Sequence, residues 1–190
     1  THTIIQNSVI HDCRGNCLFV NQAKSISITN NIFFHSRGDT VFVSEYMSDF
    51  TFSNNLLIGT TKLSPSNQNE NLFGFLQIPP SDFSILNSIT ITNNLLQGSE
   101  GTGFALPATE CSRIGSYSYS NNTAGSCEVA FIYESATTVS SSCLAAKGAV
   151  AYASKVGLMA NLASANLNQV EYRGMMFADN LRALTLRFSH

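Results

Sequence analysis

The segment Ser88-Ile89-Thr90-Ile91-Thr92-Asn93-Asn94 alternates polar and apolar residues and then ends in two asparagines. Such alternation is typical of a β-strand with one buried face, and asparagine tolerates the left-handed backbone of a tight turn. The same pattern occurs at residues 25–31, 49–55 and 116–122. Residues 3–7 are a looser copy, and residues 170–174 are a degenerate one. A strand and turn repeated along the chain indicate a solenoid.

The copies recur at a short, nearly constant interval. Their first asparagines are separated by 23, 24, 39 and 28 residues, counted from Asn7 through Asn30, Asn54 and Asn93 to Asn121. A period of about two dozen residues accommodates three short strands and three turns, and the longest interval holds an inserted loop. The leucine pattern of leucine-rich repeats is absent, and the strand alternation excludes helical repeats. We therefore predict an all-β fold, a right-handed parallel β-helix of six to seven coils of ~23–28 residues with inserted loops.

The ends of the sequence carry no polar capping repeat, so we expect residues 1–190 to be a single β-helix fragment of a larger protein. A polar stretch at residues 60–72 is predicted to protrude as a loop, and residues 107–115 form an irregular excursion. Residues 143–190 are atypical coils, in which residues 149–159 are predicted to be strand, turn and strand. The inward strand positions predict the core: Ile26, Ile28, Phe33, Val41, Val43, Phe50, Phe52, Leu57, Ile89, Ile91 and Leu95.

Composition excludes several classes of partner. Charged residues are 12% of the chain and the net charge is −2, so no nucleic acid is expected. No apolar run approaches the ~18 residues of a membrane helix, so no membrane contact by this segment is expected. The sequence contains no phosphate-binding loop, zinc-protease motif or nucleophile elbow, and we expect neither a cofactor nor a metal.

Five cysteines and the low charge favour an oxidising, extracellular compartment. Cys111, Cys127 and Cys143 are spaced by 16 residues, so one disulfide among the three is expected. Cys13 and Cys17 either close a turn or pair with segments outside this sequence. Cys13 and Cys127 also share a coil position at which other coils have serine or threonine, which indicates that a small residue is needed there.

The repeated first asparagine has a structural interpretation. Its side chain is expected to stack from coil to coil and to hydrogen-bond as a ladder. The ladder would comprise Asn7, Asn30, Asn54, Asn93 and Asn121. Asn121 also begins the one glycosylation sequon, Asn121-Asn122-Thr123, and is therefore a candidate glycosylation site.

A charged cluster on neighbouring turns is the candidate catalytic site: His11, Asp12, Arg14, His35, Arg37 and Asp39. Many β-helix enzymes cleave polysaccharides with clustered carboxylates and a basic residue, and two carboxylates can act as acid and base. Only two carboxylates occur here, and exposed turns of solenoids often carry such residues without chemistry. Arg37-Gly38-Asp39 is also an integrin-type tripeptide, but Arg14-Gly15-Asn16 repeats it one coil earlier, which favours a turn.

The coils resemble the parallel β-helix segment of fibrocystin and fibrocystin-L, large extracellular proteins of ciliary and cell surfaces. The resemblance rests on the Ile-x-Ile-x-Asn-Asn coils, the Cys-x-Gly-x-Cys turn at Cys13 to Cys17, and residues 150–159 followed by 176–180. It covers most of the chain and implies a non-catalytic ectodomain that assembles into a surface fibre or ciliary appendage. Relatives in this wider group include hyaluronan-degrading surface proteins, but no motif matching their catalytic residues occurs here.

We therefore expect a non-catalytic structural or adhesive module of an extracellular protein at the cell or ciliary surface. Its expected partners are other protein chains or other domains of the same protein, with glycans as a further candidate. The alternative is a carbohydrate-active β-helix, of the polysaccharide lyase or hydrolase type, or a glycan-binding one. Acidic side chains converging in a groove with a basic residue would favour that alternative, whereas a smooth exterior of serine, threonine and asparagine would favour the scaffold.

Overall fold

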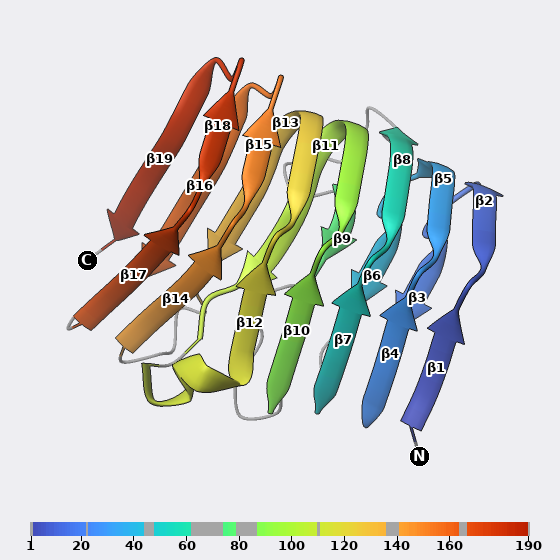
Figure 1. Cartoon of the computed structure of the whole chain (residues 1–190), viewed down its shortest axis with the longest axis horizontal. Coiled ribbons are helices and arrows are strands. Elements are labelled where there is room, and N and C mark those ends of the chain that lie inside the picture. Colours follow the sequence, from blue (N-terminus) through green and yellow to red (C-terminus); the bar gives the residue numbers. More distant parts are fainter. Residues whose placement is uncertain are drawn as a thin grey trace.

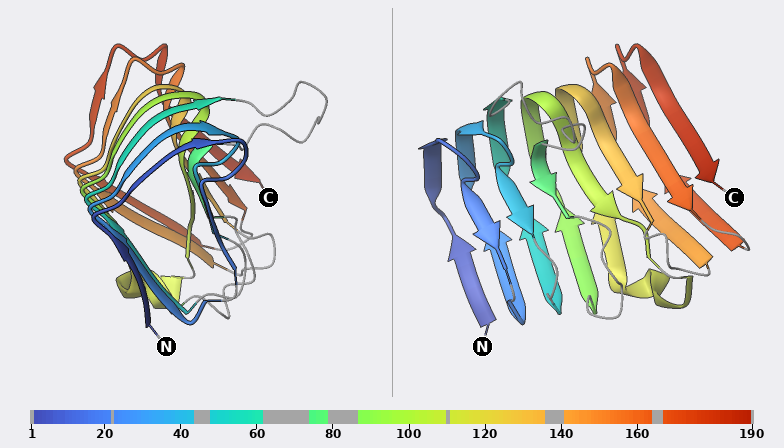
Figure 2. Two further views of the ribbon diagram at one scale, coloured as in Figure 1. Left: turned by 90° about the vertical axis from the view of Figure 1, so that its right-hand side faces the viewer. Right: turned by 180° about the vertical axis from the view of Figure 1, so that it is seen from behind.

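In the computed structural model, the chain winds into a parallel β-helix with three faces (Figure 1). The structure describes residues 2–21, 23–43, 48–61, 74–78, 87–109, 111–135, 141–163 and 167–189. Viewed from the N-terminal end, successive strands turn clockwise as the chain recedes, so the helix is right-handed (Figure 2, left). Nearly all parallel β crossovers have this hand. The predicted fold class is therefore confirmed.

The first face is a parallel sheet of seven strands in the order β1-β4-β7-β10-β12-β14-β17. The strands are β1 (His2–Gln6), β4 (Ser25–Thr29), β7 (Asp49–Ser53), β10 (Ser88–Thr92), β12 (Tyr117–Ser120), β14 (Ser141–Lys147) and β17 (Leu167–Arg173). The repeated motifs stack in register, with Ile26 opposite Phe50 and Phe50 opposite Ile89. Seven strands stack on this face, so the chain makes six turns between β1 and β17.

The other two faces share one twelve-stranded sheet. The second face comprises β2 (Val9–Cys13), β5 (Ile32–Arg37), β8 (Leu56–Thr61), β11 (Leu95–Pro107), β13 (Thr123–Glu134), β15 (Val150–Tyr152) and β18 (Met176–Ala178). The third face comprises β3 (Leu18–Val20), β6 (Val41–Val43), β9 (Gly74–Gln77), β16 (Val156–Ala163) and β19 (Arg182–Ser189). The ends of β11 and β13 complete the third face, because these long strands continue around the corner. The 3₁₀ helix η1 (Cys111–Ser116) leads back to β12.

The two asparagines of each turn have different roles. The first is exposed and has a left-handed backbone, with φ of 54–58° at Asn7, Asn30, Asn54, Asn93 and Asn121. The second is buried, and its side chain bonds from coil to coil at Asn31, Asn55, Asn94 and Asn122. The amide Nδ2 of one residue donates to Oδ1 of the next at 2.9–3.1 Å. The ladder therefore lies one residue later than the sequence analysis placed it, because only the second side chain points into the turn.

All but one of the predicted core residues are buried. The exception is Leu95, which is 42% exposed, whereas its neighbour Leu96 is fully buried. Leu95 follows the buried Asn94 directly, so the alternation places it on the outside. Aromatic rings stack between coils within the core, as Phe104 does on Phe131 at a centroid distance of 5.1 Å. Each buried large side chain stabilises the fold by about 1.5–3 kcal/mol.

The structure describes only parts of the segments that were predicted to be irregular. Of the loop predicted at residues 60–72, residues 60 and 61 are the end of β8, and the rest lies outside the described residues. The excursion at residues 107–115 contains most of η1. Residues 149–159 contain β15, a bend and the start of β16, so strand, turn and strand is confirmed. That residues 1–190 are a single fragment of a larger protein, with atypical coils at 143–190, stays a prediction.

Candidate functional site

A column of left-handed residues runs along the corner where the second face ends. In strand register it comprises Asp12, His35, Gly59, Gly98, Ser126, Ala153 and Asp179, all with positive φ. Glycine adopts this backbone freely, whereas a side chain makes it less favourable by about 1–2 kcal/mol. Asp12 and His35 are therefore two polar, titratable side chains held next to each other at positions where glycine is the default.

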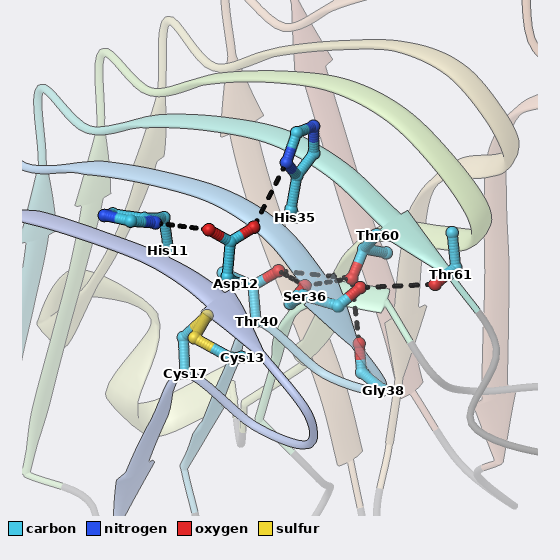
Figure 3. Close-up of a disulfide and its surroundings, with 10 residues drawn as sticks. All are labelled: His11, Asp12, Cys13, Cys17, His35, Ser36, Gly38, Thr40, Thr60 and Thr61. Carbon is cyan, nitrogen blue, oxygen red and sulfur yellow. Dashed lines mark hydrogen bonds and ion pairs between the residues drawn. A yellow bond between two sulfur atoms is a disulfide. The ribbon is translucent and has the colours of Figure 1, made fainter.

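The Asp12 carboxylate contacts two imidazoles. Nδ1 of His11 lies 2.7 Å from Oδ2 of Asp12, and Nδ1 of His35 lies 3.4 Å from Oδ1 (Figure 3). The hydrogen bond from His11 is the main cause that lowers the pKa of Asp12, and the charges of both imidazoles add to it. His11 in turn stacks on Phe34 at a centroid distance of 4.7 Å. The carboxylate thus orients both rings and leaves each Nε2 for another partner.

Asp12 and His35 border an open hollow of about 540 Å³ at this corner. Arg14 and Arg37 line it as well, and the rest of the lining is Cys13, Ser36, Gly59 and Thr61. A Cβ at position 59 would lie 3.5 Å from Cδ2 of His35, so Gly59 leaves that space open. The disulfide Cys13–Cys17 closes the turn that carries Arg14. Among the described residues, no group of three or more His, Cys, Asp or Glu side chains could hold a metal ion.

The structure does not bring the two predicted carboxylates into this hollow. Asp39 is not part of its lining, and its Oδ1 accepts a hydrogen bond from the Gly74 N–H at 2.8 Å. Of the residues predicted as a cluster, His11, Asp12 and His35 are in contact, Arg14 and Arg37 border the same space, and Asp39 lies elsewhere. Within the described part of the chain, the hollow is lined by one carboxylate instead of the pair used in glycoside hydrolysis.

Comparison with known protein families finds a match over most of the chain. Residues 1–170 match the family described as CEMIP beta-helix. The chain belongs to the CEMIP beta-helix family. No match to a curated protein or to a solved structure was found. The narrower resemblance to fibrocystin and fibrocystin-L stays a prediction.

The cysteines of this CEMIP beta-helix domain form two disulfides, Cys13–Cys17 and Cys111–Cys143. Cys127 keeps a buried thiol, and burial raises its pKa to about 12. Its side chain occupies the inward position of its coil, which explains why it does not take part in the disulfide expected among the last three cysteines. The disulfides and the family are consistent with an extracellular location. No helix in the described ranges has the length and hydrophobicity needed to cross a membrane.

A buried cluster of hydroxyl groups supports the corner beneath the hollow. Ser36 Oγ hydrogen-bonds to Thr40 Oγ1 at 2.5 Å and to Thr60 Oγ1, and Thr60 donates to the Gly38 carbonyl at 2.8 Å (Figure 3). Ser36 and Thr60 hold the same coil position as Cys13 and Cys127. These short contacts explain why the coils of this chain have small residues there.

Asn121, the exposed first asparagine of the pair in the fifth coil, remains the candidate glycosylation site. Asn121 is exposed, and its neighbour Asn122 is buried in the ladder. A Cβ at position 148 would lie 2.4 Å from Oδ1 of Asn121, so Gly148 leaves room for this side chain. Glycosylation itself stays a prediction.

The outside of the second face is a further candidate surface that was not predicted from the sequence. Its outward positions form two columns, largely apolar but interrupted by His11, Gln97 and Thr123, that we call the apolar stripe: Val9, Ile32, Leu56, Leu95, Thr123, Val150 and Met176, beside His11, Phe34, Ile58, Gln97, Gly125, Tyr152 and Ala178. Val9 is 59% exposed and Met176 is 56% exposed. The signal was present in the runs Ile32-Phe33-Phe34 and Leu56-Leu57-Ile58, because parallel strands without alternation are typically covered on both sides.

Substitution of Asp39 by asparagine is expected to remove a pH dependence of stability. Burial raises the pKa of Asp39 to about 6 from an ordinary value of 3.8, so the folded state binds a proton that the unfolded state releases. This contribution is complete below about pH 4 and is lost as the pH rises through 6, and it amounts to roughly 2–3 kcal/mol. Urea denaturation between pH 4 and 7 should show this slope in the wild type and a flatter profile in Asp39→Asn. Parallel profiles would rule out the raised pKa.

Proposed function

We propose that this CEMIP beta-helix domain is a non-catalytic structural and adhesive module of an extracellular protein, and that it contacts neighbouring protein chains or domains through the apolar stripe. The supporting observation is the contrast between two faces of the same solenoid. The first face presents Ser27, Thr51 and Thr90 outward, as a solvated sheet does. The second face presents aliphatic side chains outward at the same levels. Contiguous exposed apolar patches mark sites of protein contact.

The dimensions of the apolar stripe indicate what kind of contact it makes. Strands spaced by ~4.8 Å give a length of roughly 30 Å, and two outward residues per strand give a width of about 10–15 Å. The resulting area of roughly 300–450 Å² is about half of the ~800 Å² that a specific interface covers on each partner. The stripe therefore suits docking between domains of one longer chain, or a weak contact repeated many times in a surface assembly.

Photo-crosslinking in the full-length protein tests this role. A photoreactive phenylalanine analogue at Ile58 should crosslink to another chain or domain in the native assembly, because Ile58 is an exposed member of the stripe. The same analogue at Thr51, on the first face of the same coil, is the matched control and should give few crosslinks. Equal yields at the two positions, or none at Ile58, would count against contact through the stripe.

A charged substitution in the stripe should weaken the assembly without unfolding the domain. Leu95→Lys places an ammonium group on the apolar stripe, where Leu95 already faces outward, so the stability of the isolated chain should change by less than about 1 kcal/mol. The association measured in the full-length protein should fall by about tenfold or more, which corresponds to ~1.4 kcal/mol. Thr90→Lys, on the first face of the same coil, should leave association unchanged.

The proposal includes a location at the ciliary surface, which is motivated by the resemblance to fibrocystin and fibrocystin-L. Immunolocalisation of the full-length protein in ciliated cells checks it. Staining of the cell surface without cilia would remove only the ciliary part.

The alternative, a carbohydrate-active or glycan-binding β-helix, is supported by the hollow beside Asp12. Its weakness is that one carboxylate lines the hollow among the described residues, whereas glycoside hydrolysis uses two. Polysaccharide cleavage by the purified chain that is lost in Asp12→Asn would favour this alternative over the structural role.

A further inference from the structure

We propose that the hollow bordered by Asp12, Arg14, His35 and Arg37 binds a tetrahedral oxyanion, the sulfate or phosphate ester group of a larger ligand. The inference goes beyond the structural role, because the hollow lies at the corner of the solenoid and its function does not depend on the apolar stripe. It follows from the charges that meet in the hollow, from the way the corner is built and from the size of the space.

The charged groups of the hollow favour an anion. Arg14 and Arg37, each of which carries a guanidinium group, line a space whose lining contains one carboxylate among the described residues. That carboxylate is engaged by His11 at 2.7 Å and by His35 at 3.4 Å. The hollow therefore has an excess of positive charge in a chain whose net charge is −2. Guanidinium groups bind oxyanions through pairs of parallel hydrogen bonds, which makes arginine the preferred partner of sulfate and phosphate groups.

The corner fixes these groups more firmly than an ordinary surface turn would. Asp12 and His35 both have a φ of 55°, and backbone strain of this kind is concentrated at functional sites. The disulfide Cys13–Cys17 fixes the ends of the turn that carries Arg14. The buried hydroxyls of Ser36 and Thr60 support the neighbouring turn that carries Arg37. Donors held in advance lose less entropy when a ligand binds.

The arrangement selects a tetrahedral anion over a planar one. Arg14 and Arg37 follow the paired residues Cys13 and Ser36, so their backbones are stacked on adjacent coils, ~4.8 Å apart. His35 belongs to the left-handed column two residues before Arg37, so its imidazole adds a third polar group at a separate position of the lining. A sulfate or phosphate ester has three terminal oxygens, one for each of these three side chains, whereas a carboxylate has only two. The volume of about 540 Å³ lies in the range of pockets for whole ligands, about 300–1,000 Å³, so the anion is one group of a larger molecule.

Binding should be linked to proton uptake. Imidazole is the side chain that gains its charge between about pH 8 and 5. The charged and titratable groups that the described residues place around His35 are Asp12, Arg14, Arg37 and, across the carboxylate, His11. A protonated His35 adds a positive charge and an Nε2–H donor to the hollow. The affinity for the anion should therefore increase as the pH falls.

An NMR titration of the whole isotope-labelled chain tests the proposal with inorganic sulfate and inorganic phosphate as probes. Resonances of residues around the hollow should shift saturably, with a dissociation constant in the millimolar range that decreases severalfold from pH 7.5 to 5.5. Arg37→Gln should weaken binding at least fivefold, and His35→Asn should remove most of the pH dependence. Asp12→Asn should tighten binding, because it removes the one carboxylate and asparagine tolerates the left-handed backbone. Arg182→Gln, an exposed arginine at the far end of the solenoid, is the matched control and should bind as the wild type does.

Each arm of the titration decides something. Shifts that do not saturate, or equal losses in Arg37→Gln and Arg182→Gln, would overturn the site. Acetate binding as tightly as sulfate would overturn the tetrahedral class and leave a carboxylate site. Preference for sulfate over phosphate, or the reverse, identifies the type of ester carried by the ligand. Crosslinking from Ile58 reads out the structural role separately, so the failure of one proposal is distinguishable from the failure of the other.

Discussion

Replacing Asn55 with alanine is expected to lower the free energy of unfolding by about 3–5 kcal/mol. Its Oδ1 accepts hydrogen bonds from the backbone N–H of Asn31 at 2.9 Å and from Nδ2 of Asn31 at 3.1 Å. Its Nδ2 donates to the Ile28 carbonyl at 2.9 Å and to Oδ1 of Asn94 at 3.1 Å. Asn31 and Asn55 are buried, so alanine would leave donors and acceptors without water or protein partners. Each such group costs about 1–3 kcal/mol.

The preceding asparagine provides a matched control for this substitution. Asn54 is exposed and has a φ of 56°, so glycine should replace it with little effect, and alanine should cost about 1 kcal/mol. Urea denaturation of Asn55→Ala, Asn54→Ala and Asn54→Gly measures the three effects on one coil. Similar losses at positions 54 and 55 would show that the ladder is not the main role of the second asparagine.

The repeat made most of the fold predictable, and the same reasoning explains where prediction failed. Alternation within each strand and a constant period determine which residues face the core, because every coil must bury the same positions. Leu95 was placed wrongly because Leu95 and Leu96 are both apolar, and only the register with Phe33 and Leu57 assigns the inward position to Leu96. The ladder was assigned to the first asparagine of each pair because both asparagines repeat at the same interval, so their spacing does not distinguish them. Sequence spacing shows that two asparagines form a turn, but the backbone of the turn decides which side chain points inward.

The candidate site was predictable only where its residues are one coil apart. His11, Asp12 and His35 meet because the period of 23 residues stacks them, and that spacing can be counted in the sequence. Asp39 accepts a hydrogen bond from the Gly74 N–H. The two residues are 35 positions apart in the sequence, a separation that does not match the period of the coils. The apolar stripe was visible in the sequence as runs of three apolar residues. It was missed because only the middle residues, Phe33 and Leu57, were predicted as core, and the outward first and third members were given no role.

Loss of the disulfide Cys111–Cys143 is the second large effect that we expect. The disulfide joins residues 32 positions apart, and constraint of a loop of that length in the unfolded chain contributes roughly 3–4 kcal/mol. Cys13–Cys17 spans only 4 positions and should contribute about 2 kcal/mol in the same entropy model. The longer disulfide also attaches η1 to β14, beside the bridge between Thr109 and Cys143. The double substitution Cys111→Ser and Cys143→Ser should therefore destabilise the domain more than Cys13→Ser and Cys17→Ser.

Urea denaturation of the two double variants, with and without a reducing agent, measures the difference directly. Reduction should lower the stability of the wild type by more than it lowers either variant, because each variant has already lost one disulfide. Peptide mapping under non-reducing conditions should find Cys127 unpaired, since its thiol is buried in the core and its pKa is raised to about 12. An equal effect of the two double substitutions would show that loop closure is not the source of the stabilisation. A disulfide that includes Cys127 would contradict the inward position of this residue, and with it the register of the fifth coil.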